Sequence, residues 1–255
     1  MCRAPSHDSI AQTEAQYLDR SKRHLGDMWI VAGQMTSLYG QLAHQIASLP
    51  DSPSRKERFV TVSVLLPAAM RAGAISILQA GRLHFQETEM LTRRTIESVG
   101  FAAIIWKNPV MTDVLLEAYD SEQTFKRFRT GFGGKRLARA LGALHPELPD
   151  QYSQRSKATH PTLQSAVLSQ TQSSSANGFE ITLHYFDAQE ENWRRRLPLC
   201  LGAMLYCHVL ALRGMATLAL ADADSCAEWE RRAEPIFQRF EAVASTWTAG
   251  QQGHE

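Results

Sequence analysis

Apolar side chains recur along almost the whole chain at intervals of three and four residues, the period of one face of an α-helix. Between Asp8 and Leu49 this pattern predicts one long amphipathic helix. Its repeating positions are Tyr17, Leu25, Met28, Trp29, Ala32, Met35, Leu38, Leu42 and Ile46. Pro50 and Pro53 follow directly and should end this helix.

Three more helices are expected before residue 130. The stretch "SRKE", Ser54 to Glu57, fits a capping box and should open a helix that reaches about Gly81. Pro67 lies inside that helix and should kink it. Another helix is expected over about 83–107. Asn108 followed by Pro109 is typical of a helix start, so the next helix should run to about residue 129.

The second half of the chain alternates helices with loop-like segments. The stretch "TGFGGK", 130–135, predicts a flexible loop, followed by a short helix to about Leu144 and two short helices on either side of 151–163. Residues 169–178 are rich in Ser and Gln and favour a loop, whereas 178–186 alternate like a strand and predict a short hairpin or extended arm.

The chain should end in two long helices and a short tail. An apolar helix is expected over about 190–221, and a last helix should start at a capping box of Ser225 and Glu228 and bend at Pro235. There is no repeat and no alternation of strands with helices. We therefore expect an all-α bundle of about 7–9 helices, with one domain over 1–248 and a frayed tail over 249–255.

Composition and charge fit an ordinary soluble protein. Of 255 residues, 44% are apolar, and 27 Lys and Arg nearly balance 26 Asp and Glu, so no overall field steers the chain to nucleic acid or to an anionic membrane. The four cysteines favour reduced thiols and a cytoplasmic location. Residues 197–221 could span a bilayer by length, but His208 and Arg213 near their middle favour a buried bundle helix without membrane contact.

Cofactor and metal motifs are missing from the sequence. "GFGGKR" differs from a phosphate-binding loop, because Arg129 stands at the first glycine position and Arg136 follows the lysine. No helical His-x3-His or Glu-x-x-His pair occurs among the nine histidines. We therefore expect no cofactor and no metal.

One local positive run does stand out. No acidic residue lies between Glu122 and Glu147, and this interval holds six cations. They are Lys126, Arg127, Arg129, Lys135, Arg136 and Arg139. Such a run is commonly a solvated helix face, and the alternative is a patch that contacts RNA or another phosphate-bearing ligand.

Arg155 and His160 have the Arg-x4-His spacing of some metal-independent RNA-cutting enzymes. In such a site His160 would move protons while Arg155 stabilises phosphate charge. However, about two matches to Arg-x4–6-His are expected by chance, and the chain has two, the other being Arg139 with His145. Pro161 also places His160 at a helix boundary, where a capping role is common.

A second set of polar residues lies in "EMLTRRTIESVGFAAIIW". Arg93 and Glu97 are four residues apart and share a helix face at the entrance to an apolar segment. Arg71 lies within another apolar helix. Because unpaired buried charges are costly, we expect Arg71, Arg93 and Glu97 to form a polar cluster inside the bundle.

"LTRRTIES", read as Leu-x-Arg-x3-Glu, resembles the middle helix of a loosely related, largely uncharacterised group of bacterial all-α proteins. A Tyr-x3-Ser-x3-His-Pro stretch of that group is matched by Tyr152, Ser156, His160 and Pro161. Some members look related to the HEPN (higher eukaryote and prokaryote nucleotide-binding) superfamily, which includes RNases of toxin and phage-defence systems. The likeness is diffuse over 60–215 and would add Ser156 and His160 to the polar cluster.

These observations lead to two hypotheses. The first is a HEPN-like bundle that acts in binding or assembly, as a homo-oligomer or with a protein partner, within a defence or toxin–antitoxin setting. The alternative is a metal-independent endoribonuclease that uses His160 with Arg155 or Arg93 and holds RNA on the 126–139 segment. The sequence leaves open whether the cluster around Arg93 and Glu97 is a site or an internal brace.

Overall fold

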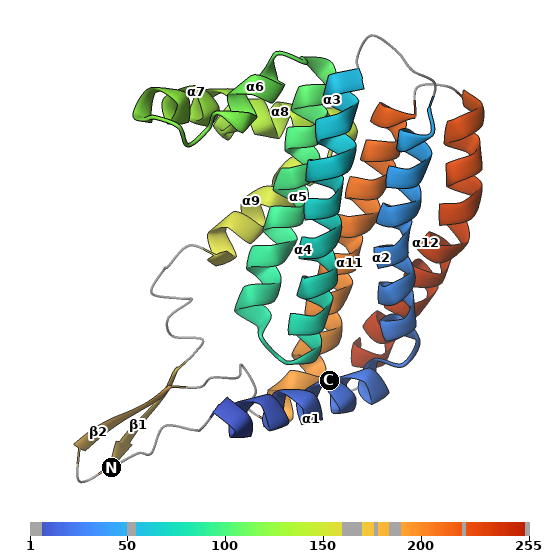
Figure 1. The fold of residues 1–255 in the computed structure, drawn as a ribbon. Helices are drawn as coiled ribbons and strands as arrows, with labels where there is room; N and C mark the ends of the chain where they lie inside the picture. The colour runs from blue at the N-terminus through green and yellow to red at the C-terminus, as the bar shows by residue number, and fades with distance from the viewer. Residues whose placement is uncertain are drawn as a thin grey trace.

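The computed structural model describes residues 7–49, 55–159, 170–175, 178–183, 190–220 and 223–252. In these ranges the chain is a multi-helix bundle, which confirms the predicted all-α class. The body consists of long helices that run side by side (Figure 1). They are α2 (Asp27–Ala47), α4 (Leu66–Gly81), α5 (Phe85–Lys107), α11 (Glu190–Ala219) and α12 (Ala223–Gln252).

Helix α11 packs against α2, α4, α5 and α12 and supplies much of the core. Its fully buried leucines include Leu197, Leu201, Leu205 and Leu212. Two helical stretches of the described chain, Arg58–Gly81 and Trp193–Ala219, are long and apolar enough to cross a membrane. In the second, 67% of the apolar window is buried inside the protein. The expectation of a buried bundle helix over 197–221 agrees with this packing.

The expected single helix over 8–49 is wrong, because Gly26 divides it into α1 (His7–Leu25) and α2. Gly26 has a φ of 49°, a left-handed conformation that ends α1 and turns the chain. Helix α1 then lies across one end of the bundle (Figure 1). The apolar period continues through the break because both helices bury a face, so periodicity alone did not reveal it.

The kink expected at Pro67 takes the form of a π-helical turn. Helix α3 (Arg55–Val60) runs into the π-helical segment η1 (Thr61–Leu65), which leads into α4 with Pro67 in its first turn. Proline has no N–H for the carbonyl four residues earlier and its ring crowds that carbonyl, so a widened turn accommodates it. At the other end of α4, Leu83 has a φ of 64°, in a tight turn where its side chain is fully buried.

An arm of three helices projects at the end of the bundle opposite α1 (Figure 1). It contains α6 (Met111–Leu116), α7 (Glu122–Phe132) and α8 (Gly134–Leu144). The expected helix from 109 to 129 is therefore two helices, because Ser121 and Thr124 form a capping box that restarts the chain as α7. The expected loop over 130–135 is also wrong: α7 continues to Phe132, and Gly134, with a φ of 51°, allows α8 to begin after one residue.

Helix α9 (Leu148–Thr159) packs on α5, α8 and α11. Strands β1 (Gln170–Ser175) and β2 (Gly178–Leu183) form an antiparallel hairpin, so the expected hairpin begins earlier than predicted and includes part of the expected loop. Helix α12 starts two residues before Ser225 and continues to Gln252, into the segment expected to be frayed, while 253–255 lie outside the described residues. The division into one domain stays a prediction.

Candidate functional site

The polar cluster expected around Arg93 and Glu97 lies between α5 and α9. Arg93 donates from Nε and Nη2 to Glu97 Oε1, at 3.1 and 3.0 Å. The Tyr152 hydroxyl donates to the same oxygen at 2.8 Å, and the guanidinium of Arg93 lies over the Tyr152 ring, 5.6 Å from its centroid. One carboxylate oxygen thus accepts three hydrogen bonds and ties α9 to α5. Burial and the bond to Glu97 both raise the pKa of Tyr152, which keeps its hydroxyl protonated.

Arg155 of α9 forms a second ion pair between the same two helices, with Glu89 of α5. Its Nη1 lies 2.5 and 2.6 Å from the two carboxylate oxygens of Glu89, and the two side chains are only 12% and 20% exposed. Burial alone would lower the pKa of Arg155, but the bonds to Glu89 outweigh it and the pKa is raised. The guanidinium is therefore charged and already neutralised by a carboxylate.

Cys207 of α11 lies beside this pair, and its thiol donates to Gln151 Oε1 at 3.5 Å. Burial raises its pKa to about 11, although Arg155 acts in the opposite direction. A thiol with such a pKa stays protonated at neutral pH and is a poor nucleophile. Cys207 therefore packs as a small core residue.

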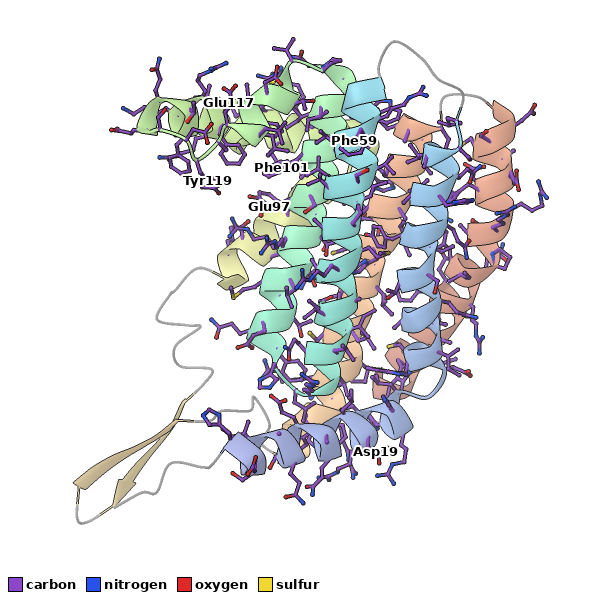
Figure 2. All side chains as sticks on the ribbon, viewed as in Figure 1. Asp19, Phe59, Glu97, Phe101, Glu117 and Tyr119 are labelled. Carbon is purple, nitrogen blue, oxygen red and sulfur yellow. The ribbon has the colours of Figure 1, made fainter. Side chains whose placement is uncertain are left out.

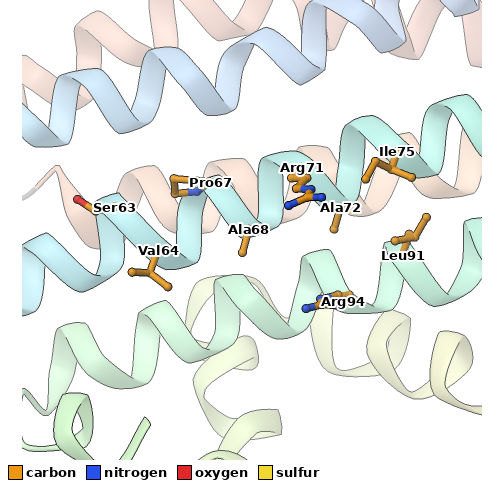
Figure 3. A pocket seen from close by; sticks show the side chains of 9 residues that line it. All are labelled: Ser63, Val64, Pro67, Ala68, Arg71, Ala72, Ile75, Leu91 and Arg94. Atoms are coloured by element: carbon orange, nitrogen blue, oxygen red, sulfur yellow. The ribbon is translucent and has the colours of Figure 1, made fainter. Parts of the chain in front are cut away.

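The other members expected in the cluster have different outcomes. Ser156 joins it through a hydrogen-bonding contact with Tyr152. His160 lies outside the described residues, so its part in the cluster stays a prediction. The placement of Arg71 in the cluster is wrong: its side chain is exposed and lines a separate groove with Arg94, on the face between α4 and α5 (Figure 3). The expectation assumed that Arg71 is buried because the sequence around it is apolar, whereas Arg71 lies on the side of α4 that faces away from the core.

Sequence reasoning missed Glu89, and a signal for it was present. Glu89, Arg93 and Glu97 follow one another at intervals of four residues and so form a charged stripe along one face of α5. Helix α9 covers this stripe with Tyr152 and Arg155. Two cations and two carboxylates compensate one another there, so these four described side chains carry no net charge that would attract a phosphate. This arrangement is that of a brace between helices.

The six cations of the basic segment are all exposed, on α7 and α8. Lys126 pairs with Glu122, and Arg127 lies 3.9 Å from Glu117. Among the described residues no acidic side chain pairs with the other four, which are Arg129, Lys135, Arg136 and Arg139. The last three share the outer face of α8, because its opposite face buries Leu137, Ala140 and Leu141.

The same arm also carries a row of aromatic rings that starts at α5. Phe101 of α5 makes edge contacts with Phe128 and Phe132, and Phe128 stacks on Phe132 with a centroid distance of 5.3 Å. The row continues outward from Phe128 to Phe125 and Tyr119. Tyr119 is 83% exposed and lies further out on the arm than Phe101 (Figure 2).

Tyr119 was missed because it lies in the turn between α6 and α7, where an isolated tyrosine gives no periodic signal. Its position against Phe125, with a centroid distance of 5.8 Å, exists only once the two helices fold back on each other.

Comparisons of the chain with models of protein families, with curated proteins and with solved structures found no match. The resemblance to the HEPN superfamily therefore stays an expectation. In the described ranges no group of three or more His, Cys, Asp or Glu side chains could hold a metal ion.

Proposed function

We propose that this chain is a binding module whose arm, α6 to α8, holds single-stranded nucleic acid, RNA in the first place. The observation that carries this proposal is that one arm holds both an aromatic row, which ends at the exposed Tyr119, and four exposed cations without acidic partners among the described residues. Single strands are commonly held by such a combination: bases stack on aromatic rings while Lys and Arg follow the phosphates.

The geometry of the arm supports this function in two ways. Tyr119 is highly exposed but rests on Phe125 and, through Phe128, on the core, so its ring is supported from behind and can take a base without a large ordering cost. The cations of α8 project from a helix that packs firmly on α5, so their positions are fixed by the bundle. A near-neutral protein needs such a local patch to bind a polyanion.

Cleavage of RNA through Arg155 or Arg93 is not favoured. Each guanidinium is already bound to a carboxylate, and a phosphate would have to displace Glu89 or Glu97 from a partly buried position. We therefore infer binding as the primary activity and keep nuclease activity with His160 as the alternative. A cytoplasmic homo-oligomer in a defence or toxin–antitoxin setting belongs to the same proposal and rests on the HEPN resemblance and on composition.

Fluorescence anisotropy with a labelled mixed-sequence RNA of about 20 nucleotides tests the proposal. We expect saturable binding that weakens as salt rises, because counterions are released from the strand. Tyr119→Ala should weaken binding by roughly 5- to 100-fold, the effect of losing one stacked base. The triple variant Lys135→Gln, Arg136→Gln, Arg139→Gln should lower the slope of log K against log salt by about 2.

The matched control carries Arg23→Gln, Arg195→Gln and Arg231→Gln, which remove the same charge from exposed positions on α1, α11 and α12. It should bind RNA like the wild type. Equal losses of RNA affinity in both triple variants would mean that binding depends only on the net charge of the protein, which would contradict a site on the arm. Cleavage of the RNA in EDTA that Arg155→Ala abolishes without loss of folding would favour the nuclease instead.

A further inference from the structure

A groove runs along the outer face between α4 and α5, away from the arm and from the brace. Its volume is about 580 Å³, within the range of small-molecule sites. Helix α4 and the π-helical segment supply most of the lining, and α5 supplies Leu91 and Arg94 (Figure 3). The α4 side of the lining consists of Ser63, Val64, Pro67, Ala68, Arg71, Ala72 and Ile75.

Two arginines lie on the two sides of this groove, Arg71 on α4 and Arg94 on α5 (Figure 3). Both are exposed, and neither has an acidic partner among the described residues. Their neighbour Arg93 points instead toward α9, where Glu97 neutralises it. Several other arginines of the described chain also have carboxylate partners, such as Arg213 with Glu234 and Arg239 with Asp27. Within the described ranges, no carboxylate compensates the positive charge of this groove.

The walls between these arginines are apolar and partly exposed. Val64 is 46% exposed, and Pro67, Ala68 and Ile75 are half-buried along the same face of the helix. The π-helical turn before Pro67 widens the helix at this end of the groove, and such turns are frequent at functional sites. The Ser63 hydroxyl, next to Val64, adds one donor and acceptor at the same end.

We propose that this groove binds a small soluble amphiphile, an apolar chain or ring that carries one carboxylate or phosphate group. The planar guanidinium groups of Arg71 and Arg94 match both anions, and the aliphatic walls match the apolar body. A second copy of this chain fits the groove less well, because a twofold axis would bring the same arginines face to face. The concave shape favours a compact ligand over a flat membrane surface. This site is independent of the nucleic-acid site on the arm.

Isothermal titration of the full chain with decanoate, kept below its micelle concentration, tests the proposal, with dodecyl phosphate as a second probe. We expect one saturable site with a Kd of about 1 mM or tighter. Arg71→Gln and Arg94→Gln should each weaken binding roughly tenfold. Ala68→Trp should block the groove while both arginines remain. Arg231→Gln, an exposed arginine on α12, is the matched control and should bind like the wild type.

Three results would overturn the proposal: decanol binding as tightly as decanoate, binding unchanged in both arginine variants, or no binding of either anionic probe. Lipid headgroups carry the same phosphate group, and sedimentation with phosphatidylglycerol vesicles tests whether the groove binds them in place of a soluble ligand. If vesicles are bound through Arg71 while soluble probes are not, the face contacts membrane and the soluble-ligand assignment is wrong. Circular dichroism of each variant checks that the bundle is folded, which is expected because both arginines are exposed.

Discussion

At the scale of single residues, Glu97 is the side chain on which the brace between α5 and α9 depends. Its Oε1 accepts from Arg93 and from Tyr152, and so links the two helices. Removing it takes one strong, charged acceptor away from a half-buried guanidinium and a half-buried hydroxyl.

Glu97→Ala should therefore lower the free energy of unfolding by roughly 2–3 kcal/mol, the usual cost of losing charged hydrogen bonds of this kind. Chemical denaturation measures it. Glu87→Ala, an exposed glutamate of the same helix, is the control and should stay within about 0.5 kcal/mol of the wild type. A Glu97→Ala protein as stable as Glu87→Ala would contradict the brace and return these residues to the candidates for a site.

The contact between Arg93 and Glu97 could be predicted from the sequence, whereas the residues that surround this pair could not. Four-residue spacing on a predicted helix makes contact between Arg93 and Glu97 a local property, so it could be predicted. The partners on α9, 55 and 66 residues away, depend on how two helices pack. Arg71 was misplaced for the same reason: an apolar sequence indicates burial but does not say which side of the helix is buried.

At the scale of elements, glycines with positive φ divide helices whose apolar pattern is continuous. Gly26 separates α1 from α2 at a φ of 49°, and nothing lies within 4 Å of where its Cβ would be. Gly33, inside α2, is equally open but has an ordinary helical conformation. The two positions therefore differ only in backbone conformation.

This difference predicts opposite effects for the same substitution. Gly26→Ala should destabilise the fold by about 1–3 kcal/mol, since an L-residue rarely adopts a φ of 49° with a ψ of −118°. Gly33→Ala should stabilise it by roughly 0.5–1 kcal/mol through helix propensity. Thermal unfolding of the two variants and the wild type measures both changes in stability and their signs. Stabilisation by Gly26→Ala would mean that α1 and α2 form one continuous helix in solution.

Helix existence was predictable along this chain, whereas helix ends were not. The signals at the ends were present but local: Lys22, Arg23 and His24 before Gly26 are typical of a helix C-terminus, and Ser121 with Thr124 forms the capping box of α7. The prediction followed the apolar period and not these signals. An apolar period continues across a helix end whenever the two successive helices cover the same core.

At the scale of the whole molecule, His208 connects three helices of the bundle. It lies on α11, completely buried, with Nδ1 3.2 Å from the Tyr39 hydroxyl of α2. On the α4 side, Gly73 makes room for the imidazole, since a Cβ there would lie 2.2 Å from His208 Cε1. Nε2 has no hydrogen-bond partner among the described residues, so a charged ring would be poorly solvated.

Burial lowers the pKa of His208 to about 4, and it raises that of Tyr39, so both groups are neutral in the folded protein. In the unfolded chain His208 is protonated below its ordinary pKa of about 6.5, whereas in the folded chain it is protonated only below about pH 4. The contribution of His208 to stability is therefore complete above pH 6.5 and is lost as pH falls from 6.5 to 4, by an amount on the order of 3 kcal/mol.

Free energies of unfolding of the wild type and of His208→Gln, measured across this pH range, should diverge in slope, because glutamine does not titrate. His44→Gln removes an exposed histidine of α2 and should leave the slope unchanged. If His208→Gln fails to fold, the wild-type imidazole can be titrated by NMR, where an ordinary pKa would contradict the burial. A shift confined to His208 would tie the acid sensitivity of the bundle to the contacts of this imidazole with Tyr39 of α2 and Gly73 of α4.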